Sequence, residues 1–150
     1  SLEYTLNIRK INTYMKYKLI VLMLASGLLA NATQTCPLMK GEENDPDESV
    51  TVKGEQLDFC CGTCNKKFSE NKAYYIKAIP YLYEKFTTAQ RTELGVDKVK
   101  LLDQLNCPVY PERVVNPNSP SIEHNGKTIY FWSSSAVRRF KKNPEKYLNQ

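Results

Sequence analysis

Three of the five cysteines in this 150-residue chain lie in one short stretch, FCCGTCNKKF. Cys60 and Cys64 are spaced C-x3-C, and Cys61 forms an overlapping C-x2-C pair with Cys64. Cys36 precedes Cys60 by 24 positions, and Met39 stands where the second member of a C-x2-C pair would fall. Two short chelating pairs on separated segments are typical of a zinc ribbon, in which thiolates close a tetrahedral cage. The spacing therefore predicts a metal site.

The ligand types narrow the choice of ion. Thiolates bind Zn(II), while a thioether in the fourth position shifts the preference toward a softer ion such as Cu(I). We expect one site that holds Cu(I) or Zn(II). Its ligands come from Cys36, Cys60, Cys61 and Cys64, with Met39 as a further candidate.

The frame around these cysteines occurs twice in the chain. Cys36-Pro37-Leu38 corresponds to Cys107-Pro108-Val109 at an offset of 71. The matching pairs at an offset of 72 are Lys53-Gly54 with Asn125-Gly126, Phe59 with Phe131, Phe68 with Phe140, Asn71 with Asn143 and Tyr75 with Tyr147. A fixed offset of this kind indicates an internal duplication. We expect a first unit at residues 33–79, a linker at 80–106 and a second unit at 107–150.

Each unit is expected to be a β-hairpin followed by a helix, which makes the fold α+β and similar to a zinc ribbon. The dipeptide Asn125-Gly126, between Ile122 and an apolar run, is a strong signal for a two-residue hairpin turn. The linker is expected to contain one or two amphipathic helices, interrupted near Gly95. Because each unit alone is small for a stable core, the linker should pack the two units together.

The second unit lacks most of the sulfur of the first. Trp132, Ser133 and Ala136 stand at the positions of Cys60, Cys61 and Cys64, and Tyr110 stands at the position of Met39. Cys107 is retained, and the sequence leaves open whether it completes the metal site of the first unit. His124 is the only histidine, and we interpret it as a surface residue. The second unit is therefore expected to keep the fold without the metal site, with Trp132 filling the space.

These residues resemble a known family. The pattern C-P-[LV] followed by [YF]-C-C-x-x-C-x-x-x-F is similar to the TRASH motif and to the related YHS domain. The second unit looks like a YHS domain along its whole length, most clearly in GKTIYF and FKKNPEKYL. The resemblance implies a small metal-binding module, a treble-clef-like or ribbon-like hairpin plus helix, used in heavy-metal sensing, trafficking or resistance, often for copper. It also implies Cys36, Cys60 and Cys64 as ligands, with Met39 where many relatives have cysteine.

Two other interpretations of the cysteines remain open. In a disulfide scaffold, Cys36 would pair with Cys60, Cys61 or Cys64, and the protein would serve as an interaction or structural module without metal. In a thiol redox protein, the C-x2-C of Cys61 and Cys64 at a helix start would be the reactive pair. The βαβ pattern expected around a thioredoxin-like motif is missing.

The composition and the remaining motifs exclude several function classes. The hydrophobic share of 41% and the charged share of 25% are those of an ordinary globular protein. Of the net charge of +5, the first 32 residues carry four basic residues against one acidic, which leaves 17 against 15 for the rest. So small an excess gives little attraction for nucleic acid. With no Ser-His-Asp set and no Gly-rich phosphate loop, we expect a protein that is not an enzyme.

The start of the chain resembles a leader. Residues 15–32 combine a short positive region, an apolar run of 12 residues at 19–30 and a small-x-small cleavage pattern ending at Ala32. The run is shorter than the roughly 20 residues that span a bilayer. We expect cleavage near Ala32 and a periplasmic or secreted protein, the alternative being an uncleaved signal that anchors it in the membrane. Residues 1–14 are expected to be a spurious upstream extension.

The sequence thus predicts an exported heavy-metal-binding protein for metal binding, trafficking or sensing. Its expected partners are the metal ion and a metal transporter or another exported protein.

Overall fold

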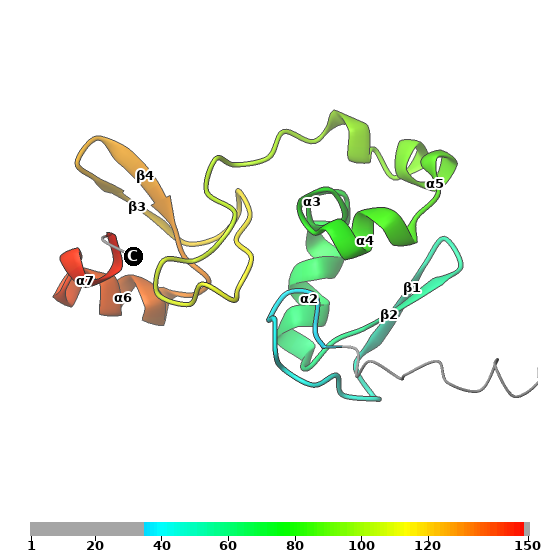
Figure 1. Cartoon of the computed structure of the whole chain (residues 1–150), viewed down its shortest axis with the longest axis horizontal. Helices are drawn as coiled ribbons and strands as arrows, with labels where there is room; N and C mark the ends of the chain where they lie inside the picture. The colour runs from blue at the N-terminus through cyan, green and yellow to red at the C-terminus, as the bar shows by residue number, and fades with distance from the viewer. Residues whose placement is uncertain (1–34, 149–150) are drawn as a thin grey trace, which may run out of the picture. The chain divides into compact units, whose positions relative to one another are not determined.

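The computed structural model describes residues 35–148, so the leader and the upstream extension expected at residues 1–32 lie outside the described residues. Within residues 35–148 the fold is α+β, with two two-stranded antiparallel hairpins and several helices (Figure 1). Its elements are β1 Ser49–Val52, β2 Glu55–Asp58, α2 Gly62–Glu70, α3 Lys72–Ala78, α4 Pro80–Lys85, α5 Thr88–Glu93, the 3-10 helix η1 Val96–Lys98, β3 Ser121–His124, β4 Lys127–Tyr130, α6 Ser134–Lys142 and α7 Glu145–Leu148. Below, residues 35–79 are called the first unit and residues 107–148 the second unit.

The two hairpins have the same register and the same turn. Ser49 pairs with Asp58 in the first, and Ser121 pairs with Tyr130 in the second. Each turn has two central residues with positive φ: Lys53 at 51° with Gly54 at 85°, and Asn125 at 50° with Gly126 at 74°. Two positive φ values in a two-residue loop define the type I′ turn, whose twist matches that of the flanking strands. Asn and Gly tolerate this conformation readily, whereas Lys53 is an uncommon residue there.

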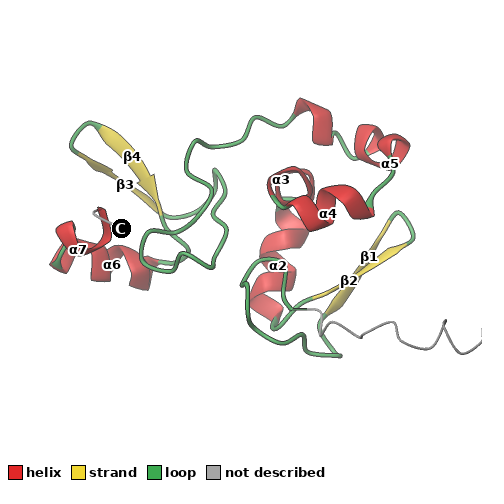
Figure 2. Ribbon diagram, in the orientation of Figure 1, coloured by secondary structure: helices red, strands yellow, loops and turns green. Residues whose placement is uncertain are grey.

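A helix follows each hairpin (Figure 2). In each unit, a phenylalanine of this helix packs against the phenylalanine that follows the second strand. Both helices end at an asparagine: Asn71 N–H donates to the Phe68 carbonyl at 3.0 Å, and Asn143 N–H donates to the Phe140 carbonyl at 3.1 Å. The ring centroids are 5.2 Å apart for Phe59–Phe68 and 5.1 Å for Phe131–Phe140, then 6.4 Å for Phe68–Tyr75 and 6.2 Å for Phe140–Tyr147. These matched contacts position the start of each helix next to the end of its hairpin.

The linker is helical only in its first part. It contains α4, α5 and η1, and Gly95 separates the last two with a φ of +73°. Residues 99–106 contain no helix, although their leucines prompted the expectation of one. Leu102 N–H instead donates to the Tyr74 hydroxyl at 3.4 Å, and the Gln104 side chain exchanges hydrogen bonds with the Tyr130 backbone. The segment is thus held by tertiary contacts that helical periodicity does not reveal.

The described residues belong to one compact part of the chain, and one apolar core includes side chains from both units and the linker. A buried polar contact joins the units: the Asn116 side-chain amide donates to the Tyr75 hydroxyl at 2.6 Å, and both residues are almost fully buried. Nearby, the Asn118 amide donates to the Asn71 side-chain oxygen at 2.9 Å. The first unit is therefore packed against the segment that leads into β3.

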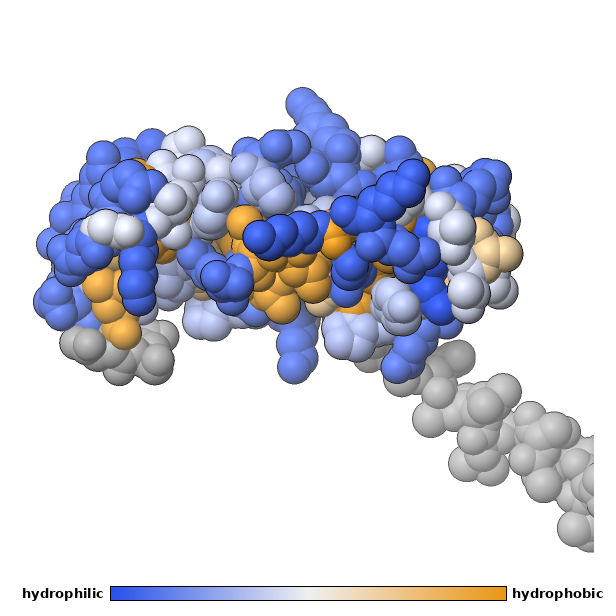
Figure 3. Space-filling view, turned by 90° about the horizontal axis from the view of Figure 1, so that it is seen from above, coloured by the Kyte–Doolittle hydropathy of each residue, from blue (hydrophilic) through white to orange (hydrophobic). Residues whose placement is uncertain are grey.

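Hydrophilic side chains cover most of the face drawn in Figure 3, with an apolar area exposed between them. Among the described residues, the large apolar side chains with substantial exposure are Tyr81, Tyr83 and Leu148. In this part of the chain, no helix has the length and apolar character needed to cross a membrane.

The Tyr75–Asn116 contact gives a stability prediction. Tyr75→Phe should lower the free energy of unfolding by about 1–3 kcal/mol, because it leaves the buried Asn116 amide without its acceptor. Tyr147→Phe is the matched control: Tyr147 lies at the corresponding position of the second unit but is only half-buried, and its change should stay within about 0.5 kcal/mol. Urea unfolding of both variants measures the difference. Equal losses would show that this hydrogen bond adds nothing.

Candidate metal centre

Three cysteine sulfur atoms converge in the first unit. The Sγ atoms of Cys36, Cys60 and Cys64 all lie within 4.8 Å of one another. Cys36 and Cys64 are 1% and 0% exposed, whereas Cys60 is half-buried. All described cysteines are free thiols. A group of three thiols in this arrangement could hold a metal ion.

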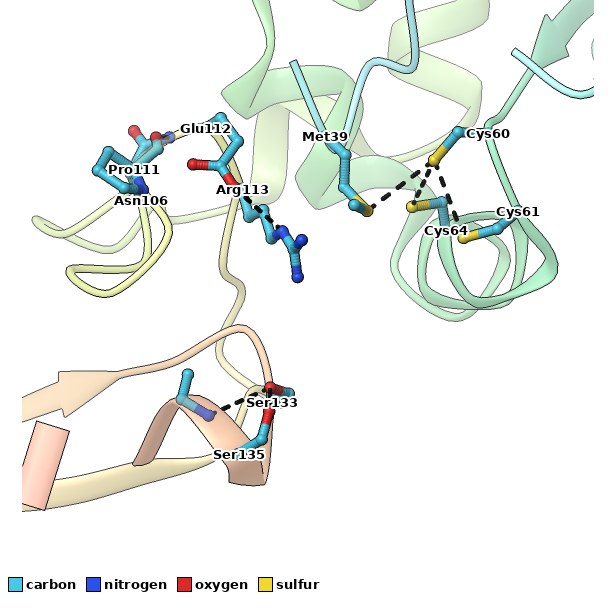
Figure 4. Close-up of polar contacts among 11 residues, drawn as sticks. Met39, Cys60, Cys61, Cys64, Asn106, Pro111, Glu112, Arg113, Ser133 and Ser135 are labelled. Carbon is cyan, nitrogen blue, oxygen red and sulfur yellow. Dashed lines mark hydrogen bonds and ion pairs between the residues drawn. The ribbon is translucent and has the colours of Figure 1, made fainter. Parts of the chain in front are cut away.

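Cys60 lies at the centre of a wider group of sulfur atoms (Figure 4). Its Sγ is 3.7 Å from Cys64 Sγ, 3.8 Å from Cys61 Sγ and 3.9 Å from Met39 Sδ. With metal–sulfur bonds of about 2.3 Å, two sulfur ligands of one tetrahedral ion are separated by about 3.8 Å. The three distances from Cys60 therefore match the separation of sulfur ligands that share one ion. We call Met39, Cys36, Cys60, Cys61 and Cys64 the sulfur cluster.

Three local structures bring the cluster together. Cys60 lies two residues after the end of β2, next to Phe59, whose N–H donates to the Glu48 carbonyl at 2.8 Å. Cys61 is the N-cap of α2, and Cys64 lies in the first turn of this helix. Cys36 begins a loop, residues 36–43, that closes when Cys36 N–H donates to the Glu42 carbonyl at 2.8 Å. The ligands thus come from a strand end, a helix start and a closed loop.

The second unit holds the Cys36 loop in place. Met39 forms an isolated antiparallel bridge with Arg113. On either side of it, Lys40 N–H donates to the Glu112 carbonyl at 3.0 Å and Val114 N–H donates to the Leu38 carbonyl at 3.3 Å. The position of the Met39 backbone therefore depends on the loop at residues 107–114. Backbone pairing between the two Cys-Pro loops was not foreseen from the sequence.

The buried thiols perturb one another. A hydrogen bond from the Cys64 thiol lowers the pKa of Cys36 to about 5, and backbone N–H groups of Cys60 and Leu38 act in the same direction. Burial raises the pKa of Cys60 to about 12. The pKa of Cys64 is raised, first by the hydrogen bond that it donates to Cys36 and then by burial. The three sulfur atoms therefore carry one negative charge among them, because a thiolate opposes the ionisation of thiols held close to it.

Cys61 differs from its neighbours because it is half-buried at the helix start. Burial opposes ionisation of its thiol, but the pKa of Cys61 is lowered because hydrogen bonds from Cys64 and from the Thr63 backbone outweigh the burial. The Cys61 side chain makes no capping hydrogen bond of normal geometry at the start of α2. Its thiol therefore ionises more readily than an ordinary cysteine, which suits a metal ligand.

The other two residues considered from the sequence lie outside the cluster. Cys107 is fully buried in the second unit and does not belong to the group of three thiols found among the described residues. His124 lies at the end of β3, where its ring packs edge-on against Phe140 with centroids 5.4 Å apart. Neither residue is brought to the sulfur atoms.

In the second unit, packing occupies the place of the cluster. Trp132 and Ala136, which correspond to Cys60 and Cys64, are 5% and 0% exposed. The Arg113 guanidinium lies 4.3 Å from the Tyr110 ring centroid and 5.8 Å from the Trp132 ring centroid. A second cation, the Lys67 ammonium group of α2, lies over the same ring, 4.8 Å from the Trp132 centroid. Cations against aromatic rings therefore stand where the first unit has sulfur.

The sequence did not reveal the groups that hold the sulfur atoms in place. The backbone N–H groups of Leu38 and Cys60 hydrogen-bond the Cys36 sulfur, and Arg113 fixes the Met39 segment. Backbone donors carry no signal in residue type. The pairing of two loops 74 positions apart at Met39 and Arg113 likewise has no periodicity that could have revealed it.

Comparison of the chain with protein-family models, with curated proteins and with solved structures found no match. The functional argument therefore rests on the geometry of the sulfur cluster.

Proton release tests the ionisation of the site. At pH 7 Cys36 is ionised while Cys60 and Cys64 keep their protons, so binding of one Zn(II) to these three sulfurs should release about two protons. Acidification toward pH 5 and below should expel the ion, because protons then compete for Cys36 as well. Calorimetry in two buffers of different ionisation enthalpy measures the number released. Uptake without proton release would rule out thiolate ligation.

Met39 gives a prediction about metal preference. Met39→Leu keeps an apolar side chain of similar size but removes the thioether, so Cu(I) affinity should fall about tenfold and Zn(II) affinity should change less. Cys107→Ala is the matched control, since it removes a buried sulfur outside the cluster, and it should leave both affinities unchanged. Competition with a chromophoric chelator measures them. An equal loss in both variants would mean that the ligand set is wrong.

Proposed function

We propose that the chain is an exported protein that captures a soft or borderline metal ion, Cu(I) or Zn(II), through the thiolates of Cys36, Cys60 and Cys64. One observation carries the proposal: these three Sγ atoms lie within 4.8 Å of one another, and two of them are fully buried. Three converging thiols with a thioether beside them make a soft ligand set, which selects for such ions over Mg²⁺ or Ca²⁺.

Several features favour metal over a disulfide as the occupant of this cluster. A disulfide would use two sulfur atoms at about 2.05 Å and leave the other three without a role. The observed separations of 3.7–3.9 Å around Cys60 are those of ligands that share an ion. A small hairpin–helix unit also buries little apolar surface, so a metal ion adds stability that its core lacks.

The family part of the proposal is a tandem of two YHS- or TRASH-like units in which the second has lost its metal site. It is supported by the matched hairpin registers, the matched ring contacts and the matched helix ends. In this proposal the first unit binds the ion. The second unit stabilises it, because residues 112–114 hold the backbone beside Met39.

We place the activity in metal binding, trafficking or sensing and not in catalysis. In the described part of the chain the sulfur cluster is the only group of three or more metal-ligating side chains close enough to hold an ion. The proposed compartment is the periplasm or the exterior, after cleavage near Ala32. A metal transporter or another exported protein would supply or receive the ion.

Metal content tests this proposal directly. The full chain, exported and purified without chelator, should contain near-stoichiometric copper or zinc by elemental mass spectrometry. Cys64→Ala should abolish this, and it is a conservative test because Ala136 occupies the corresponding buried position of the second unit. Cys107→Ala should retain the metal.

The same sample separates the metal from the disulfide. Intact mass under non-reducing conditions should equal that of five free thiols once the metal is removed. A metal-free protein whose mass is lower by two hydrogens for each pair of cysteines would show that disulfides hold the first unit together. The proposal would then be wrong.

A further inference from the structure

The sulfur cluster contains more ligands than one ion requires. Around Cys60 Sγ, the sulfur atoms of Cys64, Cys61 and Met39 lie at 3.7, 3.8 and 3.9 Å, and Cys36 lies within 4.8 Å. A sulfur atom with neighbours on several sides at this spacing is placed to bridge two ions. Thiolate sulfur has the lone pairs to do so.

Building on the proposed function, we infer that the cluster has the capacity for two Cu(I) ions, with the Cys60 thiolate as the bridge. The inner ion is bound by Cys36, Cys60 and Cys64. The outer ion is bound by Cys60 and Cys61, with the Met39 thioether 3.9 Å from Cys60 as a third sulfur, and the Cys61 thiol gives its proton to solvent as the ion binds. Copper enters and remains as Cu(I), so no electron transfer is involved.

Cu(I) and Zn(II) prefer different coordination numbers, so the cluster should hold different numbers of the two ions. Cu(I) accepts linear and trigonal geometries, so the five sulfur atoms suffice for two ions that share Cys60. Zn(II) prefers four ligands in a tetrahedron. Two such ions sharing one sulfur would need seven ligands, which is more than the cluster offers. We therefore expect capacity for two ions with Cu(I) and for one with Zn(II).

Burial distinguishes the two positions. Cys36 and Cys64 are 1% and 0% exposed, so an ion between them is shielded from solvent. Cys60 and Cys61 are both half-buried. An ion between these two can be reached by a ligand from outside. The outer ion is therefore the exchangeable one, and its acceptor would be a partner that presents a thiolate.

The second unit shows that the Cys61 sulfur is not required by the fold. Ser133 occupies the corresponding position and caps α6, its hydroxyl accepting from Ala136 N–H at 3.3 Å. Cys61 occupies the N-cap of α2 without a capping hydrogen bond from its side chain. Serine at this position should therefore preserve the helix start, or stabilise it, while removing the sulfur.

The experiment is a Cu(I) titration of the full chain and of Cys61→Ser, followed anaerobically by native mass spectrometry. Copper is delivered as its acetonitrile complex, and circular dichroism checks that both proteins are folded. The wild-type chain should fill to two Cu(I). Cys61→Ser should stop at one. Zn(II) should stop at one in both proteins.

Each other outcome is decisive. If the wild-type chain stops at one Cu(I), as Cys61→Ser does, the two-ion inference is wrong and the proposed function stands. If Cys61→Ser still takes up two ions, Cys61 does not form the outer position and the inference is also wrong. If neither protein binds Cu(I) or Zn(II), the proposed function fails together with the inference.

Discussion

The closure of a Cys-Pro loop over the end of a β-hairpin is the contact on which both units depend. In the first unit the loop beginning at Cys36 meets the end of β2 and the start of α2, and the contact is made by sulfur atoms. In the second unit, Arg113 of the loop beginning at Cys107 lies 5.8 Å from the ring centroid of Trp132, which follows β4, and Ala136 is buried in the first turn of α6. Loop, strand end and helix start are held together at one point in each unit, so the chemistry of this point decides whether a unit can bind an ion.

Sulfur in the first unit and Trp132 in the second unit stabilise this point in different ways. Burial, and after it the neighbouring Cys36 thiolate, raises the pKa of Cys60 to about 12, while the hydrogen bond from Cys64 lowers the pKa of Cys36 to about 5. A bound cation removes this conflict by accepting several thiolates at once. Trp132 removes it in another way, by filling the space with apolar surface and attracting the Lys67 and Arg113 cations to its ring face. In the proposed function, metal and aromatic packing are thus alternative means of stabilising similar hairpin–helix units.

Local signals in the sequence predicted the hairpins and the cysteine site. The Asn125-Gly126 dipeptide specifies its turn because both residues tolerate positive φ, and the chelating pairs around Cys60 follow from spacing alone. Contacts between distant segments could not be predicted in this way. The backbone bridge from Met39 to Arg113 and the buried Tyr75–Asn116 hydrogen bond depend on how loops fold against one another. The leucines of residues 99–106 pack an extended segment, so apolar spacing there pointed wrongly to a helix.

The central claim is that sulfur atoms of the first unit bind a metal ion, and X-ray absorption at the metal edge tests it most directly. The metal-loaded chain should show a first shell made only of sulfur, at about 2.3 Å for Zn(II). Cys107→Ala should leave the number of sulfur scatterers unchanged, and histidine scattering should be absent, since Cys107 and His124 lie outside the sulfur cluster. A first shell of nitrogen and oxygen ligands, with the cysteines still open to alkylation, would contradict this account.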